Sequence, residues 1–190
     1  YCMNNPLNMT DESGHWPQWI KNIATKVKNF FSPPQTVKYE VPLYKQGNTN
    51  LCWAYSQTMI ESYNNNTKMK KKEANARAKE IAVSVHGEEN WNQGGWPTGV
   101  NPANGIKIDS ITSLYDLVVE NGPVYAYYAN SDSAHLVVVT GVSVYKDKVY
   151  TNNPWGAKGS QSFDSFINGV AKKWYQDGQG LKFNYIYLME

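Results

Sequence analysis

The chain of 190 residues is long enough for one well-packed domain, and a second full domain would be hard to accommodate. Hydrophobic residues make up 41% of the sequence and charged residues 18%, which is typical of a globular protein and excludes a largely disordered chain. The formal net charge of +2 gives no general electrostatic basis for binding nucleic acid.

Residues 1–35 are expected to form an N-terminal extension that precedes a single domain at 36–190. Between Trp16 and Phe31, apolar residues recur at helical spacing with lysines among them, and prolines follow at 33 and 34. The pattern predicts an amphipathic helix. The simpler interpretation is that this helix packs on the domain's own surface, and a membrane-binding helix is the alternative.

The first half of the domain is predicted to be mainly helical. A short strand at 37–43 and a turn-rich stretch lead into a helix at about 52–63. A second helix is expected at about 70–85, and the lysines at its start are interpreted as a solvated first turn, not as a phosphate-binding patch. Residues 87–107 contain five of the 14 glycines and indicate a long irregular segment, after which a helix is expected at 111–120.

The second half changes to the period-2 pattern of strands. Val- and Tyr-rich stretches predict strands at 124–128, 135–144, 148–151 and 181–188, with a helix at 162–170 between the last two. Helices followed by an antiparallel sheet define an α+β fold class.

Cys52 stands where a helix end would activate it. It follows a turn rich in Gly and Asn and opens a predicted helix, so the positive end of the helix dipole would stabilise its thiolate. A thiol with the unshifted pKa of about 8.5 is only a few per cent ionised at neutral pH, so a nucleophile here also needs a base. The alternative interpretation is a buried, inert cysteine.

Three histidines are candidates for that base. His15 lies in the N-terminal extension, and His86 ends a predicted helix. His135 opens an apolar strand and would have one face of its ring exposed, which suits a base best. The alternative is a structural histidine with its hydrogen bonds satisfied.

Two amide side chains could support this chemistry. Asn153, in a turn with Pro154 and Trp155, could accept the second N–H of the imidazole, with the indole covering the bond, although Asn152 competes for the role. Gln46 lies six residues before the cysteine and, with the backbone N–H of the nucleophile, could form a two-donor oxyanion hole.

These segments together resemble the papain-like cysteine peptidases. Gln46 to Ala54 resembles the nucleophile segment of that family, where a glutamine precedes Cys-Trp-Ala at this spacing, and residues 134–142 resemble its histidine strand. Asn153-Pro154-Trp155-Gly156 matches the family's Asn-x-Trp-Gly motif. Gly94-Gly95-Trp96-Pro97 is similar to the glycine pair of its substrate groove, and Asn121-Gly122-Pro123-Val124 to the segment before the histidine strand.

The resemblance extends from about residue 38 to the C-terminus and is closest to the compact staphopain-like and C39-like bacterial peptidases. It implies a papain-like fold in which a helical N-terminal half, with the nucleophile helix, packs on an antiparallel sheet. It also implies a catalytic triad of Cys52, His135 and Asn153 with Gln46 in the oxyanion hole. The implied substrate-binding residues are Gly94, Gly95, Trp96, Ala134 and Trp155.

We therefore expect a cysteine endopeptidase that acts through a thioacyl-enzyme, needs no metal or other cofactor, and is a monomer. Its partners would be a protein or peptide substrate and a protein inhibitor or pro-segment, with residues 1–35 as a pro-segment remnant or an extension of the mature enzyme. The alternatives are an acyl or amide transferase and a non-catalytic module that binds peptide or glycan. The Cys-His-His or Cys-His-Glu pattern of a cell-wall amidase is not seen.

Location is predicted from composition alone. The chain begins at Tyr1, which indicates a processed or truncated product, and no apolar run approaches the roughly 20 residues of a membrane span. Two cysteines cannot form a disulfide framework, and Cys2 stays unpaired if Cys52 is the nucleophile. Few cysteines and many Asn, Tyr and Lys favour a secreted or cell-surface protein of bacterial origin.

Overall fold

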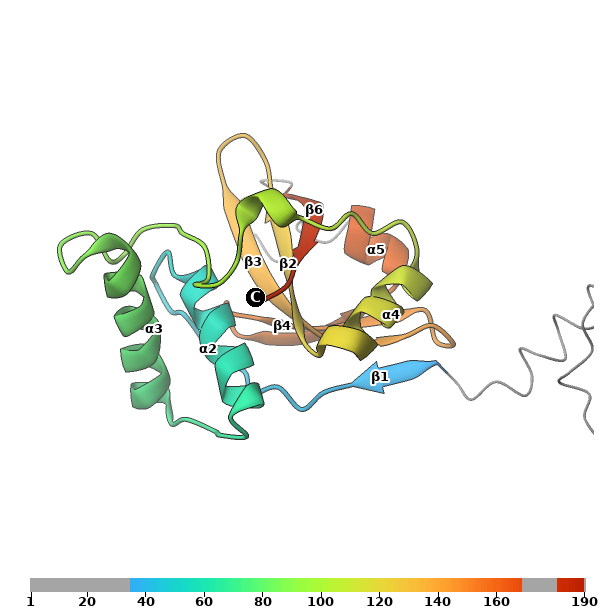
Figure 1. The fold of residues 1–190 in the computed structure, drawn as a ribbon, viewed down its shortest axis with the longest axis horizontal. Coiled ribbons are helices and arrows are strands. Elements are labelled where there is room, and N and C mark those ends of the chain that lie inside the picture. Colours follow the sequence, from blue (N-terminus) through green and yellow to red (C-terminus); the bar gives the residue numbers. More distant parts are fainter. Residues whose placement is uncertain (1–34, 169–180, 190) are drawn as a thin grey trace, which may run out of the picture. The chain divides into compact units, whose positions relative to one another are not determined.

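An antiparallel sheet holds the predicted histidine strand near its centre. Within residues 35–168 and 181–189, which the computed structural model describes, the sheet has six strands in the order β5–β4–β3–β2–β6, and β1 also pairs with β3 (Figure 1). The strands are β1 (Thr36–Lys38), β2 (Val124–Ala129), β3 (Ala134–Ser143), β4 (Lys148–Asn153), β5 (Ala157–Gln161) and β6 (Lys182–Tyr187). The helix predicted at 16–31 lies outside the described residues.

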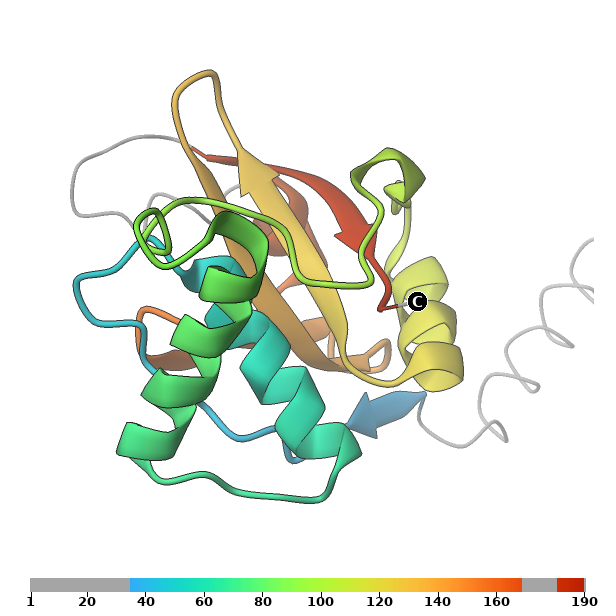
Figure 2. The same cartoon turned by 60° about the vertical axis from the view of Figure 1, so that its left-hand side comes forward.

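Helices cover both faces of this sheet, as Figure 2 shows. The described helices are α2 (Cys52–Asn64), α3 (Lys71–His86), α4 (Ile111–Asn121), α5 (Phe163–Asn168) and the short 3-10 helix η2 (Pro102–Asn104). Side chains alternate along β3, so Leu136 and Val138 pack with α2 and α3, whereas Val137 and Val139 pack with α4 and α5. Burial on both faces explains why this antiparallel strand reads as a continuous apolar run.

The nucleophile helix α2 is buried on nearly all sides. Residues 53–60 are all buried, although only one buried side was expected from the sequence. The polar members of this run are hydrogen-bonded: the Ser56 hydroxyl donates to the Leu136 carbonyl (3.2 Å) and the Thr58 hydroxyl to the Ala54 carbonyl (2.8 Å). Satisfied polar groups can be buried at little cost, which lets α2 lie between β3 and α3.

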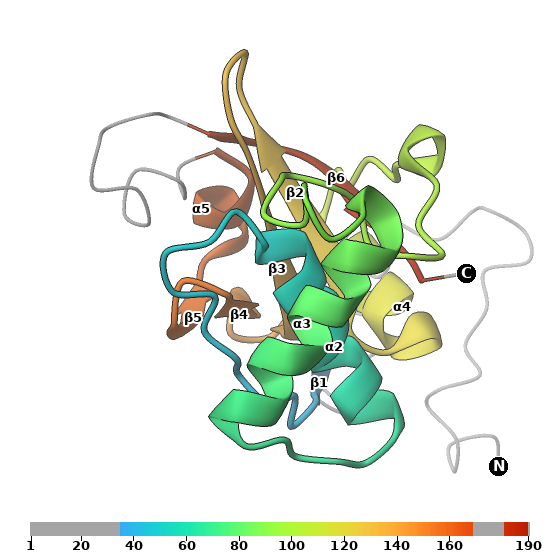
Figure 3. The same ribbon diagram turned by 90° about the vertical axis from the view of Figure 1, so that its left-hand side faces the viewer.

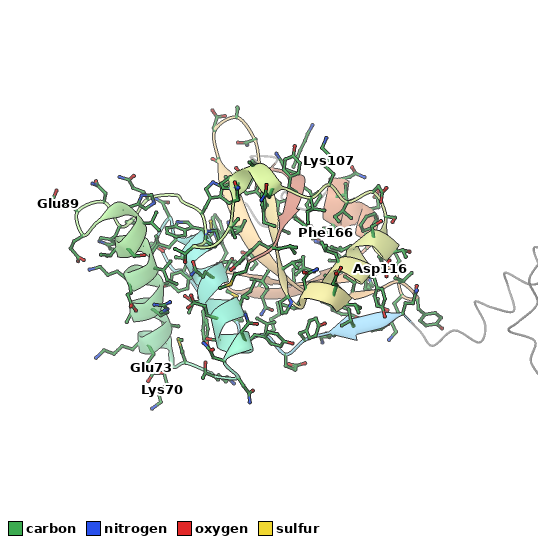
Figure 4. The ribbon with its side chains drawn as sticks, in the orientation of Figure 1. Lys70, Glu73, Glu89, Lys107, Asp116 and Phe166 are labelled. Atoms are coloured by element: carbon green, nitrogen blue, oxygen red, sulfur yellow. The ribbon has the colours of Figure 1, made fainter. Side chains whose placement is uncertain are left out.

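The lysine cluster forms the solvated start of α3, as expected. Lys71 and Lys72 are exposed in the first helical turn, and the Glu73 carboxylate accepts a hydrogen bond from the Lys70 backbone N–H at 2.7 Å. Figure 4 shows Lys70 and Glu73 together at this end of the helix. The carboxylate at the helix N-terminus satisfies one backbone N–H and complements the dipole.

The α+β class and the antiparallel sheet are confirmed, and two elements differ from prediction. The strand expected at 37–43 ends at Lys38, because the chain leaves the sheet and the Val41 carbonyl instead accepts a hydrogen bond from the Asn152 side chain at 2.9 Å. Strand β5 was not predicted, because it is a polar, mostly exposed edge strand without apolar alternation.

Gly141 is predicted to be essential for the pairing of β1 with β3. A Cβ at this buried position would lie 2.7 Å from the Lys38 Cα, in backbone that cannot move without breaking the pairing. We expect Gly141→Ala to lower the free energy of unfolding by about 1–3 kcal/mol, measured by urea denaturation. Gly159→Ala on exposed β5, where a Cβ meets only the Thr151 hydroxyl at 3.5 Å, is the matched control. Equal loss in both variants would contradict the prediction.

Candidate active site

A cleft of about 340 Å³ opens at the N-terminus of α2. Three segments meet there: the turn before α2, the irregular segment after α3, and the start of β3 with the turn that follows β4 (Figure 3). All predicted site residues except Asn153 line this cleft: Gln46, Cys52, Gly94, Gly95, Trp96, Ala134, His135 and Trp155. Asn153 is buried behind His135.

Cys52 is the first residue of α2 and is partly exposed to the cleft. No side chain caps the helix at Leu51, so the backbone N–H groups of the first turn are available to a negative charge at the cysteine sulfur. Burial raises the pKa of the Cys52 thiol, and backbone hydrogen bonding from Leu136, Trp53 and Cys52 itself opposes that rise. The thiolate is therefore disfavoured by desolvation and favoured by nearby N–H groups.

His135 is held from behind by Asn153. The imidazole Nε2 lies 2.8 Å from the Asn153 Oδ1, and the Trp155 backbone N–H donates to the same oxygen at 3.0 Å. The Trp155 indole packs edge-on against the imidazole with ring centroids 5.5 Å apart. Asn152, the competing residue, instead uses its side chain to bind the Val41 carbonyl, so the geometry favours Asn153 as the histidine's partner.

The cleft disfavours the charged form of both side chains. Burial lowers the pKa of His135 to about 4, although the hydrogen bond to Asn153 opposes this, and the same desolvation raises the pKa of Cys52. Each charged form is therefore costly alone, whereas a thiolate and an imidazolium formed together would stabilise each other.

Gln46 is held beside the turn that follows β4. Its backbone N–H donates to the Pro154 carbonyl at 2.8 Å, and its side-chain Nε2 donates to the Thr49 carbonyl. A primary amide has two N–H groups, so one is left for an oxygen in the cleft. The residue before Gln46 also packs closely against this turn, because a Cβ on Gly156 would lie 2.7 Å from the Lys45 Cε. The structure thus brings Gln46 to the cleft, but with its amide tied to its own loop.

Tyr127 is a cleft residue that the sequence analysis did not identify. Its ring packs against Trp96, with centroids 4.8 Å apart, and it pairs with Leu136 across β2 and β3. Burial raises the pKa of Tyr127, and the charge of a Cys52 thiolate adds to this effect. The hairpin register places Tyr128 opposite His135 and Tyr127 opposite Leu136, so proximity to His135 in the sequence pattern would not have singled out Tyr127. The other unpredicted lining residues are Thr49, Asn50, Trp53, Asp132, Ser133 and Leu136.

Among residues 35–168 and 181–189, no group of three His, Cys, Asp or Glu side chains is placed to hold a metal ion. The helices of the same residues include none with the length and hydropathy needed to cross a bilayer.

A buried helix that begins with a cysteine, packed on an antiparallel sheet that presents a His–Asn pair to the same cleft, defines a papain-like cysteine peptidase. The family model described as papain-like cysteine protease AvrRpt2 matches residues 34–171, and the chain belongs to this family. No curated protein matches the chain. The match supports the papain-like superfamily, and the staphopain-like and C39-like branch stays a prediction.

Protonation of His135 at acid pH is expected to lower the free energy of unfolding. Burial holds the pKa of the folded imidazole at about 4, below its ordinary value of 6.5, so the unfolded chain binds more protons between these values. The contribution of His135 to the unfolding free energy is therefore complete above pH ~6.5 and is lost as the pH falls towards 4. It should decrease by about 2 kcal/mol between pH 7 and pH 5.

Urea unfolding at both pH values measures this loss in a Cys52→Ser background, which removes the partner thiolate. Adding His135→Gln should flatten the pH dependence by about that amount. An unchanged pH dependence after that substitution would show that His135 is not the group responsible.

Proposed function

We propose that the cleft hydrolyses internal peptide bonds through a Cys52–His135–Asn153 triad and a thioacyl-enzyme. The observation that carries this proposal is the bond between the His135 Nε2 and Asn153, within a cleft that Cys52 also lines. Because Asn153 takes Nε2, the other ring nitrogen, Nδ1, is the atom we assign to proton exchange with Cys52.

The reaction would follow two steps. The Cys52 thiolate attacks the carbonyl carbon of the substrate, and the developing oxyanion accepts hydrogen bonds from the Cys52 backbone N–H and the Gln46 amide. The C–N bond then breaks, and the imidazolium of His135 gives its proton to the leaving amine. Water next attacks the thioester and gives a proton to His135, which releases a carboxylic acid and restores the thiolate.

Two features support these roles. The N-terminal N–H groups of α2 favour negative charge at Cys52, and Asn153 fixes the orientation of a buried imidazole. Gly94, Gly95, Trp96, Ala134 and Trp155 are assigned to the walls that hold the peptide, where Trp96 and the exposed Trp155 offer aromatic surface.

The alternatives share this cleft. An acyl or amide transferase would use the same thioacyl-enzyme with an amine in place of water, and product analysis with added amines separates the two. A non-catalytic peptide- or glycan-binding module would keep the aromatic walls but has no need of the His135–Asn153 bond. On sequence grounds we also propose a staphopain-like peptidase of bacterial origin. It would be secreted or surface-bound, monomeric, and inhibited by a protein or pro-segment.

Labelling and substitution of Cys52 test its role as the nucleophile. A peptidyl epoxide should attach to Cys52 in a 1:1 ratio, as measured by intact mass and peptide mapping, and hydrolysis of a casein substrate should stop. Cys52→Ala should lose all measurable turnover while its thermal unfolding midpoint changes little. Full activity in Cys52→Ala, or an adduct elsewhere on the chain, would refute the proposed mechanism.

Substitution of Asn153 tests its proposed role, which is to orient the imidazole without transferring a proton. Asn153→Ala should lower kcat/KM roughly 10- to 100-fold without abolishing it, because a misplaced base still reacts. Asn152→Ala is the matched control: it removes the bond to Val41, so it should lower stability while the kcat of the folded enzyme stays within about twofold. The reverse pattern would assign the orienting role to Asn152.

A further inference from the structure

One wall of the cleft has no regular structure of its own. Residues 92–98 lie between the end of α3 and η2, and within this segment Gly94, Gly95 and Trp96 face the cleft. Figure 2 shows the chain, in green, crossing from the end of α3 towards η2. A segment without helix or strand hydrogen bonds takes its position from contacts with its neighbours. The contacts made by this wall therefore decide the shape of the cleft.

Side chains from α2 and the residues just before it supply those contacts. Asn50 pairs with Asn92 through its backbone N–H (2.9 Å to the Asn92 Oδ1) and its side chain (3.3 Å to the Asn92 carbonyl). The Trp53 indole N–H donates to the Gln93 carbonyl at 3.0 Å. Trp53 and Gln57 lie four residues apart on α2, which places them on the same side of the helix, and Asn50 lies just before the helix begins.

Gln57 holds the far end of the wall by two contacts with a single residue. Its Oε1 accepts the Thr98 backbone N–H at 2.9 Å, and its Nε2 donates to the Thr98 hydroxyl oxygen. Gln57 is 2% exposed, whereas Thr98 is exposed, so the glutamine side of both contacts is shielded from water. A shielded hydrogen bond is costly to lose, because the buried partner is left unsatisfied.

A neighbouring ion pair fixes the orientation of this amide. The Gln57 Nε2 also donates to the Glu61 Oε1 at 2.8 Å, and Arg77 binds both oxygens of Glu61 at 2.8 and 3.0 Å. A carboxylate only accepts hydrogen bonds, so the amide nitrogen must face Glu61 and the amide oxygen must face Thr98. Arg77 also bridges to Glu80 at 3.1 Å, which ties the arrangement to α3.

The wall has little room to move where it meets the helices. A Cβ on Gly95 would lie 2.9 Å from the Trp53 ring and 2.9 Å from the His86 Nε2, so the Gly95 backbone is already in close contact with α2 and α3. Cys52 and Gln57 lie on the same helix about five residues, or ~7.5 Å of rise, apart. One rigid element therefore holds both the proposed nucleophile and the wall opposite it.

We propose that Gln57 is a positioning residue for substrate binding: by clamping Thr98, it fixes the Gly94–Trp96 wall at the distance from Cys52 that a peptide requires. This inference rests on the proposed function, because it treats the cleft as the peptide-binding site. Gln57 touches no reacting atom. Its loss should weaken reactions that need a bound peptide and spare the intrinsic reactivity of the thiol.

The test compares two reagents on the full chain. Inactivation by a peptidyl epoxide requires the wall, whereas alkylation by iodoacetamide requires only a reactive thiol. In Gln57→Ala the second-order rate with the epoxide should fall at least fivefold, and the rate with iodoacetamide should change less than twofold. Gln93→Ala is the matched control, because it removes only an exposed hydrogen bond from the Gln93 amide to the Asn90 side chain (3.3 Å) and keeps the backbone carbonyl that binds Trp53; both rates should stay within twofold.

Hydrogen exchange gives a second measurement that needs no activity. In the Cys52→Ser background, Gln57→Ala should speed amide exchange in residues 92–98 at least tenfold while exchange in β3 is unchanged. If Gln57→Ala does not fold, Thr98→Val at an exposed position removes the hydroxyl contact alone and should show the same pattern with a smaller change.

Each outcome is decisive. Equal slowing of both reagents would mean that Gln57 acts on Cys52 or on the whole fold, and no change in rate or exchange would mean that the wall is held without it; either result overturns the proposal. Faster exchange at 92–98 in a protein whose wild type never reacts with the epoxide would support the clamp and overturn the proposed function instead.

Discussion

The burial of α2 on nearly all sides is the constraint on which the rest of the structure depends. Because the helix lies between β3 and α3, its first turn opens into the cleft and its flank contacts the irregular wall at 92–98. A helix in the protein interior must satisfy every polar side chain that it carries, and α2 does so by binding β3 through Ser56 and the wall through Gln57. The hydrogen bonds that satisfy the buried polar side chains of α2 are thus the same contacts that define the cleft.

The low-polarity surroundings of the cleft also determine its acid–base chemistry. Desolvation raises the pKa of Cys52 and lowers that of His135, so neither charge is stable by itself. In the mechanism that we propose, the two charges form together, close to the helix N-terminus. This places strict demands on the orientation of His135, which the Asn153 carbonyl meets from the side away from the cleft and the Trp155 ring meets at the cleft wall.

The match to the family described as papain-like cysteine protease AvrRpt2 covers residues 34–171, which include α2 and its contacts with α3 and the wall. Cys52, Gln57 and Glu61 lie on α2; Gln57 binds the substrate wall, and Glu61 pairs with Arg77 of α3. These side chains join the proposed nucleophile helix, the substrate wall and α3.

The sequence by itself determined the local elements and the chemically distinctive residues. Helical and period-2 patterns predicted α2, α3, α4, β2, β3, β4 and β6 to within a few residues, and the motifs around Cys52 and His135 predicted two residues that line one cleft, with Asn153 buried behind the histidine. Only the tertiary structure decided between Asn152 and Asn153, ended β1 at Lys38, and revealed β5, Tyr127 and Gln57. The physical reason is that these features depend on partners distant in sequence: an edge strand carries no apolar pattern, and a glutamine becomes a clamp only when Thr98 and Glu61 fold against it.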